Sequence, residues 1–253
     1  MLIFPADRAR EVMGFYRDFI ASAPDELGGG CAFVTAPSEP FVPEPAQGTQ
    51  ILAVVVCYAG PVEEGEAAIQ PLRELEPAVD MVQPMPYIAL QSMTDAGSPS
   101  GMQNYWKAGF VEELPDEAID AFVSHAQRVT SPLTQVHLLP MGGALSRVAD
   151  GETPLALRDS TFNFHAIGMW ADPAEQAEHV GWVRELESVM RPWMSERIYL
   201  NFIGDEGEER VRSAFDSETY RRLVALKDEY DPTNMFCLNQ NIKPSQRQSQ
   251  HVS

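Results

Sequence analysis

The sequence predicts an α+β fold in which helices pack on one face of a mainly antiparallel sheet. Short stretches rich in β-branched and aromatic residues alternate with amphipathic stretches of about a dozen residues, an order that by itself also allows a parallel sheet. Two predicted strands, residues 161–170 and 197–203, carry polar side chains on one face. A polar face favours the antiparallel arrangement, because parallel sheets are usually covered on both faces.

Amphipathic segments with recognisable start or stop residues predict the helices. The clearest start is at Asp172, which can cap a helix that has Pro173 in its first turn. Asp216 can cap a later helix in the same way. Pro71 should kink or end the helix in which it lies. The predicted helices span residues 5–22, 62–75, 115–128, 172–192, 206–215 and 217–230.

Apolar and alternating segments predict the strands. Residues 50–58 are apolar throughout and rich in β-branched side chains, which is typical of a buried strand. Gly28–Gly30 read as a turn that ends the first helix. The predicted strands span residues 50–58, 87–91, 105–110, 135–140, 161–170 and 197–203.

The charge balance restricts the partners that the chain can have. The 253 residues include 18 basic and 37 acidic side chains, for a formal net charge of −19. Such a chain repels nucleic-acid phosphates and anionic membrane surfaces, so neither partner is expected. The longest apolar run, residues 51–59, is far shorter than the roughly 20 residues of a spanning helix. Because the first residues lack the apolar stretch of a signal peptide, we expect a cytoplasmic protein.

Several common catalytic and binding motifs are missing from the sequence. It contains no phosphate-binding P-loop, no dinucleotide-binding GxGxxG, no zinc-binding HExxH and no GxSxG nucleophile elbow. The five histidines lack the spacing of metal ligands, and the three cysteines lie far apart, so neither a metal site nor a disulfide scaffold is expected.

The polar faces of strands 161–170 and 197–203 are the first candidate site. If the two strands are neighbours, Asn163 and His165 share a surface with Tyr199 and Asn201. An amide, an imidazole and a phenol on a flat sheet face can form the floor of a ligand pocket. The alternative is that this face is simply the solvated side of a half-buried sheet, with His165 as a hydrogen-bonded structural residue.

The run YDPTNMFCLNQNI, residues 230–242, carries the most specific signal in the chain. Asn239, Gln240 and Asn241 are three adjacent amides that are costly to bury without partners. The run resembles the terminal motif of the berberine bridge enzyme-like family of FAD-linked oxidoreductases. Residues 199–207 are similar to the YxN[YF] segment of that family, and residues 84–91, 104–110 and 162–170 resemble the substrate domain of its bacterial branch.

The resemblance implies hydride transfer from an alcohol, sugar or benzylic carbon to FAD. It implies that Tyr199, Asn201, Asn239 and Gln240 lie at cofactor-binding positions. The base that removes the proton is left open, because Phe202 stands where many members have a second Tyr.

Two residues remain as candidates for that catalytic role. Tyr199 has an ordinary pKa near 10 and would need a neighbour that lowers it. His165 is the other candidate on the inferred polar face.

The resemblance also implies that FAD binding and substrate binding belong to two different domains. Members carry an N-terminal FAD-binding domain of the p-cresol methylhydroxylase type, with the residues that link flavin covalently, and this chain does not match it. We therefore expect a substrate-binding domain over residues 1–228, the motif segment over 229–244 and a loose tail over 245–253. A small-molecule substrate and a separate FAD-binding domain or subunit are the expected partners, without which the chain should be inactive. The alternatives are a non-catalytic binding domain and a truncated gene fragment.

Overall fold

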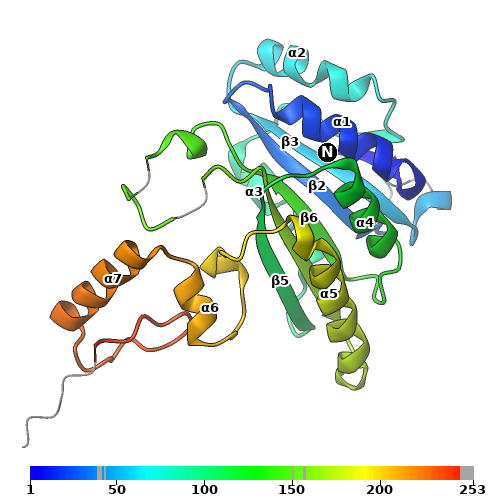
Figure 1. The fold of residues 1–253 in the computed structure, drawn as a ribbon. Coiled ribbons are helices and arrows are strands. Elements are labelled where there is room, and N and C mark those ends of the chain that lie inside the picture. Colours follow the sequence, from blue (N-terminus) through cyan, green and yellow to red (C-terminus); the bar gives the residue numbers. More distant parts are fainter. Residues whose placement is uncertain (39–41, 43, 150, 156–157, 246–253) are drawn as a thin grey trace, which may run out of the picture.

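The fold is built on one sheet of seven antiparallel strands, which confirms the predicted α+β class (Figure 1). The structure, a computed structural model, describes residues 1–38, 42, 44–149, 151–155 and 158–245. The strand order across the sheet is β4-β1-β3-β2-β6-β7-β5. The strands are β1 (Leu2–Pro5), β2 (Leu27–Thr35), β3 (Gln50–Tyr58), β4 (Val79–Asp80), β5 (Gln103–Val111), β6 (Gln135–Pro140) and β7 (Phe162–Trp170).

Helices cover one face of the sheet. Helices α1, α4 and α5 lie over this face, whereas α6 and α7 lie beside the sheet, beyond its β5 edge (Figure 1). The helices are α1 (Ala9–Ile20), α2 (Val62–Arg73), α3 (Tyr87–Ser92), α4 (Asp116–Ala126), α5 (Gln176–Met190), α6 (Glu208–Ser213) and α7 (Ser217–Tyr230). The opposite face of the sheet therefore remains for a site.

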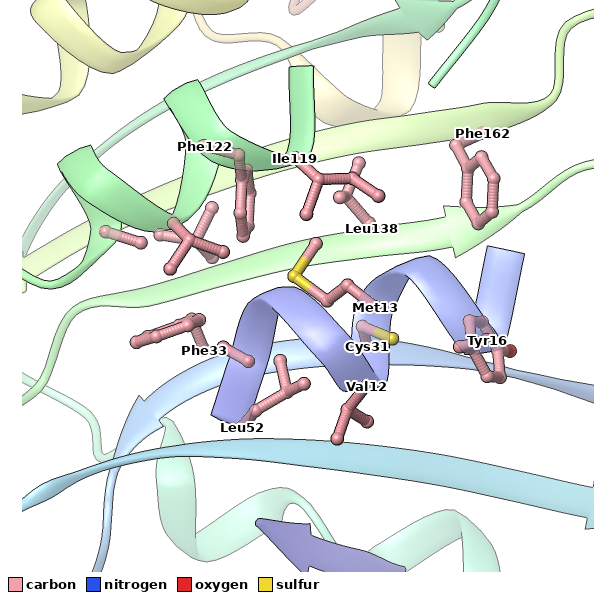
Figure 2. Packing of buried hydrophobic residues seen from close by; sticks show 14 of the residues in the cluster. Val12, Met13, Tyr16, Cys31, Phe33, Leu52, Ile119, Phe122, Leu138 and Phe162 are labelled. Carbon is pink, nitrogen blue, oxygen red and sulfur yellow. The ribbon is translucent and has the colours of Figure 1, made fainter. Parts of the chain in front are cut away.

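The main hydrophobic core lies between the sheet and these helices. Phe33, Phe122 and Phe164 meet edge to face, with ring centroids 6.3 and 6.4 Å apart. Val12 and Met13 of α1 point into the same core (Figure 2). Burying one such side chain stabilises the fold by roughly 1.5–3 kcal/mol. The core thus fixes which face of each central strand is turned away from the helices.

The predicted helix starts are confirmed at Asp172 and Asp216. Asp172 accepts a hydrogen bond from the Ala174 N–H at 2.9 Å, one turn before α5. Asp216 accepts the first N–H groups of α7. Pro71 lies inside α2, which continues to Arg73, so the helix does not end at Pro71.

Strands β1 and β2 were not predicted, and the reading of Gly28–Gly30 as a turn is wrong. These glycines lie inside β2, paired with β3. A Cβ on Gly29, whose φ is 153°, would meet the Val55 carbonyl oxygen at 2.0 Å, so the close approach of β3 requires glycine there. A Cβ on Gly30 would lie 3.0 Å from the Leu138 carbonyl oxygen of β6, which is a tight contact. The first helix accordingly begins at Ala9, because the residues before it form β1 and a short 3-10 turn.

Two other predicted strands are also wrong. Residues 87–91 lie in α3, a short helix that follows Pro86. Residues 197–203 run extended into a 3-10 turn, η7 (Leu200–Phe202). The chain meets the sheet just before this segment, where Met194 bridges Val111 of edge strand β5 and the Ser195 N–H donates to the Phe110 carbonyl oxygen at 2.9 Å. The alternating pattern of this segment therefore reflects packing of separate side chains rather than strand pairing.

The motif segment, residues 229–244, lies within the described residues, whereas of the predicted tail, residues 245–253, only Ser245 does. Among the described residues, no helix has both the length and the apolar character that crossing a membrane requires.

Candidate functional site

The face of the sheet turned away from α1, α4 and α5, called the open face here, brings two histidines together. His137 of β6 and His165 of β7 are direct cross-strand partners. Their rings are nearly perpendicular, with centroids 6.2 Å apart. His137 was not singled out from the sequence, because only the register of β6 against β7 reveals that it faces His165.

Both histidines of this pair are held neutral. Burial lowers the pKa of His137 to about 4. Burial, and in second place the neighbouring His137, lowers the pKa of His165 to about 4. Each imidazole therefore keeps one nitrogen lone pair free of a proton at neutral pH. The Nε2 atom of His137 lies 3.2 Å from the Gln135 Oε1 oxygen.

The ring of Phe202 covers His165. The two rings are stacked, with centroids 4.6 Å apart and an interplanar angle of 17°. Tyr199 meets Phe202 edge to face at 5.0 Å. The Asn201 amide donates a hydrogen bond of 2.8 Å to the Tyr199 hydroxyl oxygen. The structure thus brings His165, Tyr199 and Asn201 together through Phe202, although residues 197–203 are not a strand.

Three buried polar atoms on the open face have no hydrogen-bond partner within the described part of the chain. They are Asn163 Oδ1, His165 Nε2 and Trp106 Nε1. The register of β5 against β7 places Trp106 on the same face as the other two residues. Buried polar groups normally find a partner, so this cluster fits a ligand that supplies one.

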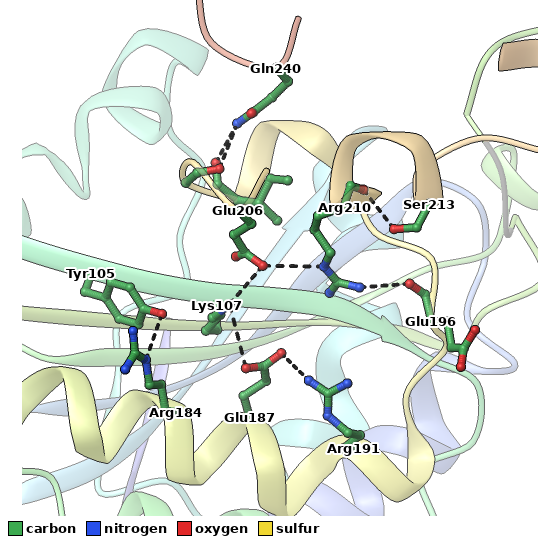
Figure 3. Close-up of polar contacts among 12 residues, drawn as sticks. Tyr105, Lys107, Arg184, Glu187, Arg191, Glu196, Glu206, Arg210, Ser213 and Gln240 are labelled. Carbon is green, nitrogen blue, oxygen red and sulfur yellow. Dashed lines mark hydrogen bonds and ion pairs between the residues drawn. The ribbon is translucent and has the colours of Figure 1, made fainter. Parts of the chain in front are cut away.

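A charged network fastens the segment that carries Tyr199 and Phe202 (Figure 3). We call residues 195–206 the crossing segment, because it leads from the helix side past β5 to the open face. Lys107 Nζ on β5 lies 2.8 Å from Glu206 and 3.9 Å from Glu187. Glu206 also pairs with Arg210 at 3.4 Å, and Glu187 with Arg191 at 2.8 Å. The sequence shows a single lysine within residues 103–111, but no local pattern shows which carboxylates pair with it.

Asp231 organises the terminal motif. It accepts the N–H groups of Met235 at 2.7 Å and Phe236 at 3.0 Å, and Lys227 Nζ lies 2.5 Å from its carboxylate. The hydrogen bond from Lys227 is the main reason that the pKa of Asp231 is lowered. Asn234 has a positive φ of 57°, a conformation that asparagine tolerates better than most residues.

The ordered motif holds apolar side chains out in solvent. Met235, Phe236 and Leu238 are 77%, 76% and 85% exposed. Gln240 donates to the carbonyl oxygen of Ile203 at 2.9 Å, which ties the motif to the crossing segment (Figure 3). Asn239 is exposed and also has a positive φ, of 58°, so it lies beside Gln240 at a turn.

Two hollows lie away from these residues. One, of about 240 Å³, lies between α2 and residues 81–93. The other, of about 550 Å³, lies at the C-terminal end of α1. Neither of these two hollows is lined by His165 or Tyr199. Among the described residues, no group of three or more His, Cys, Asp or Glu side chains is arranged to hold a metal ion.

The fold of this chain is shared, over almost its whole length, with solved structures of known proteins. Over 97% of its length the chain superposes on BBE-like #28 from Arabidopsis thaliana, with a TM-score of 0.77 and 20% identity, and it covers 56% of that structure. It superposes similarly on 6-hydroxy-D-nicotine oxidase from Arthrobacter nicotinovorans, with a TM-score of 0.75, 20% identity and 53% of that chain covered. At these identities the likeness establishes the fold alone.

The sequence comparisons identify the family. Residues 198–243 match the family model described as berberine and berberine like. The chain is 30% identical over 199 residues to the uncharacterized FAD-linked oxidoreductase YgaK of Bacillus subtilis, which covers 75% of this chain and 42% of that protein. It is also 30% identical over 156 residues to monolignol oxidoreductase AtBBE-like 13 of Arabidopsis thaliana, with 55% of this chain and 29% of that protein covered. The resemblance to the berberine bridge enzyme-like family is therefore confirmed, for a chain that spans about half or less of the relatives' length.

Proposed function

We propose that this chain is the substrate-binding and C-terminal portion of an FAD-dependent oxidoreductase that removes a hydride from an alcohol, sugar or benzylic carbon. One observation carries the proposal. The open face holds a neutral imidazole, a phenol and polar atoms that have no partner among the described residues, and the terminal motif of the berberine type is bonded through Gln240 to the segment that carries the phenol. A small molecule bound there would satisfy the buried polar atoms.

The residues present fit one side of a flavin ring system. Partnerless polar atoms and aromatic rings share the open face, which suits a flat heteroaromatic ring with polar edges. By resemblance, Tyr199, Asn201, Asn239 and Gln240 would hold FAD. When bound, FAD supplies the hydride acceptor. The chain has no glycine-rich phosphate loop, so the proposal assigns the phosphates to a separate FAD-binding domain or subunit.

His165 is the proposed base of this site. Its pKa near 4 leaves the imidazole unprotonated at neutral pH, so one ring nitrogen has a free lone pair. A pKa this low also makes it a weak base, so the proposed role requires that a bound substrate or flavin raises the pKa towards neutrality. Phe202 has no proton to exchange, and its ring shields His165 from water.

Tyr199 is the proposed partner of His165. The Asn201 amide donates to the Tyr199 oxygen, which leaves the phenol O–H free to donate to a substrate oxygen. A base and a donor then act on one bound substrate, which the two aromatic rings help to orient.

The test joins the chain to a flavin-binding partner. The chain is co-expressed with the part of B. subtilis YgaK that it does not match, and the purified complex is examined for flavin absorbance and for reduction by alcohols, sugars and benzylic amines without oxygen. We expect a coloured complex that at least one donor reduces. In His165→Ala the reduction should slow by about 100- to 10,000-fold. Tyr87→Phe, at an exposed site, serves as the control and should react normally. A complex that stays colourless, or a His165→Ala rate equal to wild type, contradicts the proposal.

A non-catalytic binding domain is the second candidate, and Phe202 is the observation that favours it. The family position that is often tyrosine is Phe202 in this chain, which has no hydroxyl and therefore no exchangeable proton. A complex that binds flavin but is reduced by no donor would support this candidate over the first.

A further inference from the structure

The hollow of about 550 Å³ at the end of α1 contains a buried arginine that no carboxylate neutralises within the described part of the chain. Arg158 is only 7% exposed. Its Nη1 donates to the Leu145 carbonyl oxygen at 3.0 Å, and its Nη2 donates to the Thr153 hydroxyl. Its Nε has no partner among the described residues. This differs from Lys107 and Lys227, which each face a carboxylate.

A second partnerless donor lines the same hollow. Ser160 is 4% exposed, and its hydroxyl has no hydrogen-bond partner among the residues that the structure describes. A buried guanidinium without a counter-charge is costly, as is a buried hydroxyl without a partner. Two such groups in one hollow therefore point to a missing anion rather than to two separate defects.

The remaining lining sets the kind of anion. Ile20, Leu114, Met141 and Phe162 form apolar walls. The rim carries carboxylates, including Glu113 and Asp159, and the whole chain has a net charge of −19. A doubly charged phosphate would meet strong repulsion there, whereas one carboxylate on an apolar body suits both the walls and Arg158.

The other arginine that lines this hollow, Arg17, is already paired with carboxylates. Arg17 pairs with Asp18 and Asp116, both at 2.7 Å. It therefore adds no free positive charge, and the charge available to an anion is that of Arg158.

We propose that this hollow is a binding site for a small hydrophobic monocarboxylate. Arg158 Nε and the Ser160 hydroxyl are closed off in this structure, so they bind the carboxylate once the side chains around them shift. The apolar body packs against Phe162 and the other apolar walls. The site is lined by none of the residues assigned to the open face, and it requires no flavin, so it stands independently of the proposed oxidoreductase function.

Calorimetric titration of the purified chain with benzoate tests the site. Benzamide, which has the same shape without the charge, is the matched ligand, and inorganic phosphate is the dianionic probe. We expect benzoate to bind and both other probes to bind at least about tenfold more weakly. Arg158→Met should weaken benzoate binding by about ten- to a hundredfold, the usual worth of hydrogen bonds to a charged group. Ser160→Ala should weaken it less.

The control variant is Arg147→Met, which removes an exposed arginine that pairs with Asp25 in the same connection between β6 and β7. It should leave benzoate binding unchanged. The proposal is wrong if wild type does not bind benzoate, if benzamide binds equally well, or if Arg147→Met weakens binding as much as Arg158→Met. Where Arg158→Met does not fold, as judged by circular dichroism, Ser160→Ala and the benzoate–benzamide comparison on wild type decide the question.

Discussion

Removing the ammonium group of Lys107 is the sharpest test of how the crossing segment is held. Lys107 and Glu206 are 14% and 16% exposed, and their charged atoms lie 2.8 Å apart. Breaking a buried pair commonly costs about 3–5 kcal/mol, because one charge remains uncompensated. Here Glu206 keeps Arg210, and Glu187 keeps Arg191. We therefore expect Lys107→Met to lower the free energy of unfolding by only about 1.5–3 kcal/mol, the usual contribution of one hydrogen bond to a charged group.

The assay is a double-mutant cycle in urea with Lys107→Met, Glu206→Gln and the combined variant. A direct interaction predicts a coupling free energy of about 0.5–3 kcal/mol between the two positions. Hydrogen exchange should also quicken in residues 195–206, because the network ties this segment to β5. The control is Arg10→Met, which breaks an ion pair between residues that are 58% and 45% exposed and should cost at most about 1 kcal/mol. A coupling free energy near zero, or a Lys107→Met cost no larger than that of the control, would refute the reasoning.

Three further predictions concern the sheet and the motif. Because the pKa values of His137 and His165 are lowered to about 4, the stability held by their neutral forms is complete above an ordinary imidazole pKa of about 6.5. That stability is lost as the pH falls towards 4, so urea midpoints should drop over this range, and less so when both residues are glutamine. Gly30→Ala should cost about 1–3 kcal/mol in urea, since its methyl group meets β6, whereas Gly14→Ala has open space and should be harmless. Asp231→Ala removes the acceptor of two motif N–H groups and should make the motif more sensitive to protease than wild type.

The sequence was most informative where one local rule determined the structure. The strands β3, β6 and β7 and the helices α4, α5 and α7 follow from side-chain periodicity and capping residues. β2 was missed because Gly28–Gly30 carry no side chains that could show a strand periodicity. Glycine occurs at these positions because of the close approach of β3 and β6, which the local sequence does not show. The crossing segment alternates like a strand, but its side chains pack on separate partners, which periodicity does not report.

The site shows the same division between local and distant information. The sequence grouped His165 with Tyr199 and Asn201 from their polar faces, and the structure brings them together by ring stacking instead of strand pairing. His137 could not be recognised, because it depends on the register of β6 against β7. Lys107 likewise has carboxylate partners about 80 and 100 residues away, so no short pattern announces it.

The stacked pair of Phe202 and His165 sets a condition on the proposed chemistry. The His165 Nε2 atom is buried, so a substrate that uses this nitrogen must displace the Phe202 ring or enter beside it. Phe202 lies on the crossing segment. The ion pair between Lys107 and Glu206 ties this segment to β5, and the hydrogen bond from Gln240 to Ile203 ties it to the terminal motif. Under the proposed function, access to the base is therefore governed by how firmly this segment is fastened. Substitutions that weaken these contacts should therefore affect the access of substrate to His165 first, and the basicity of the imidazole only afterwards.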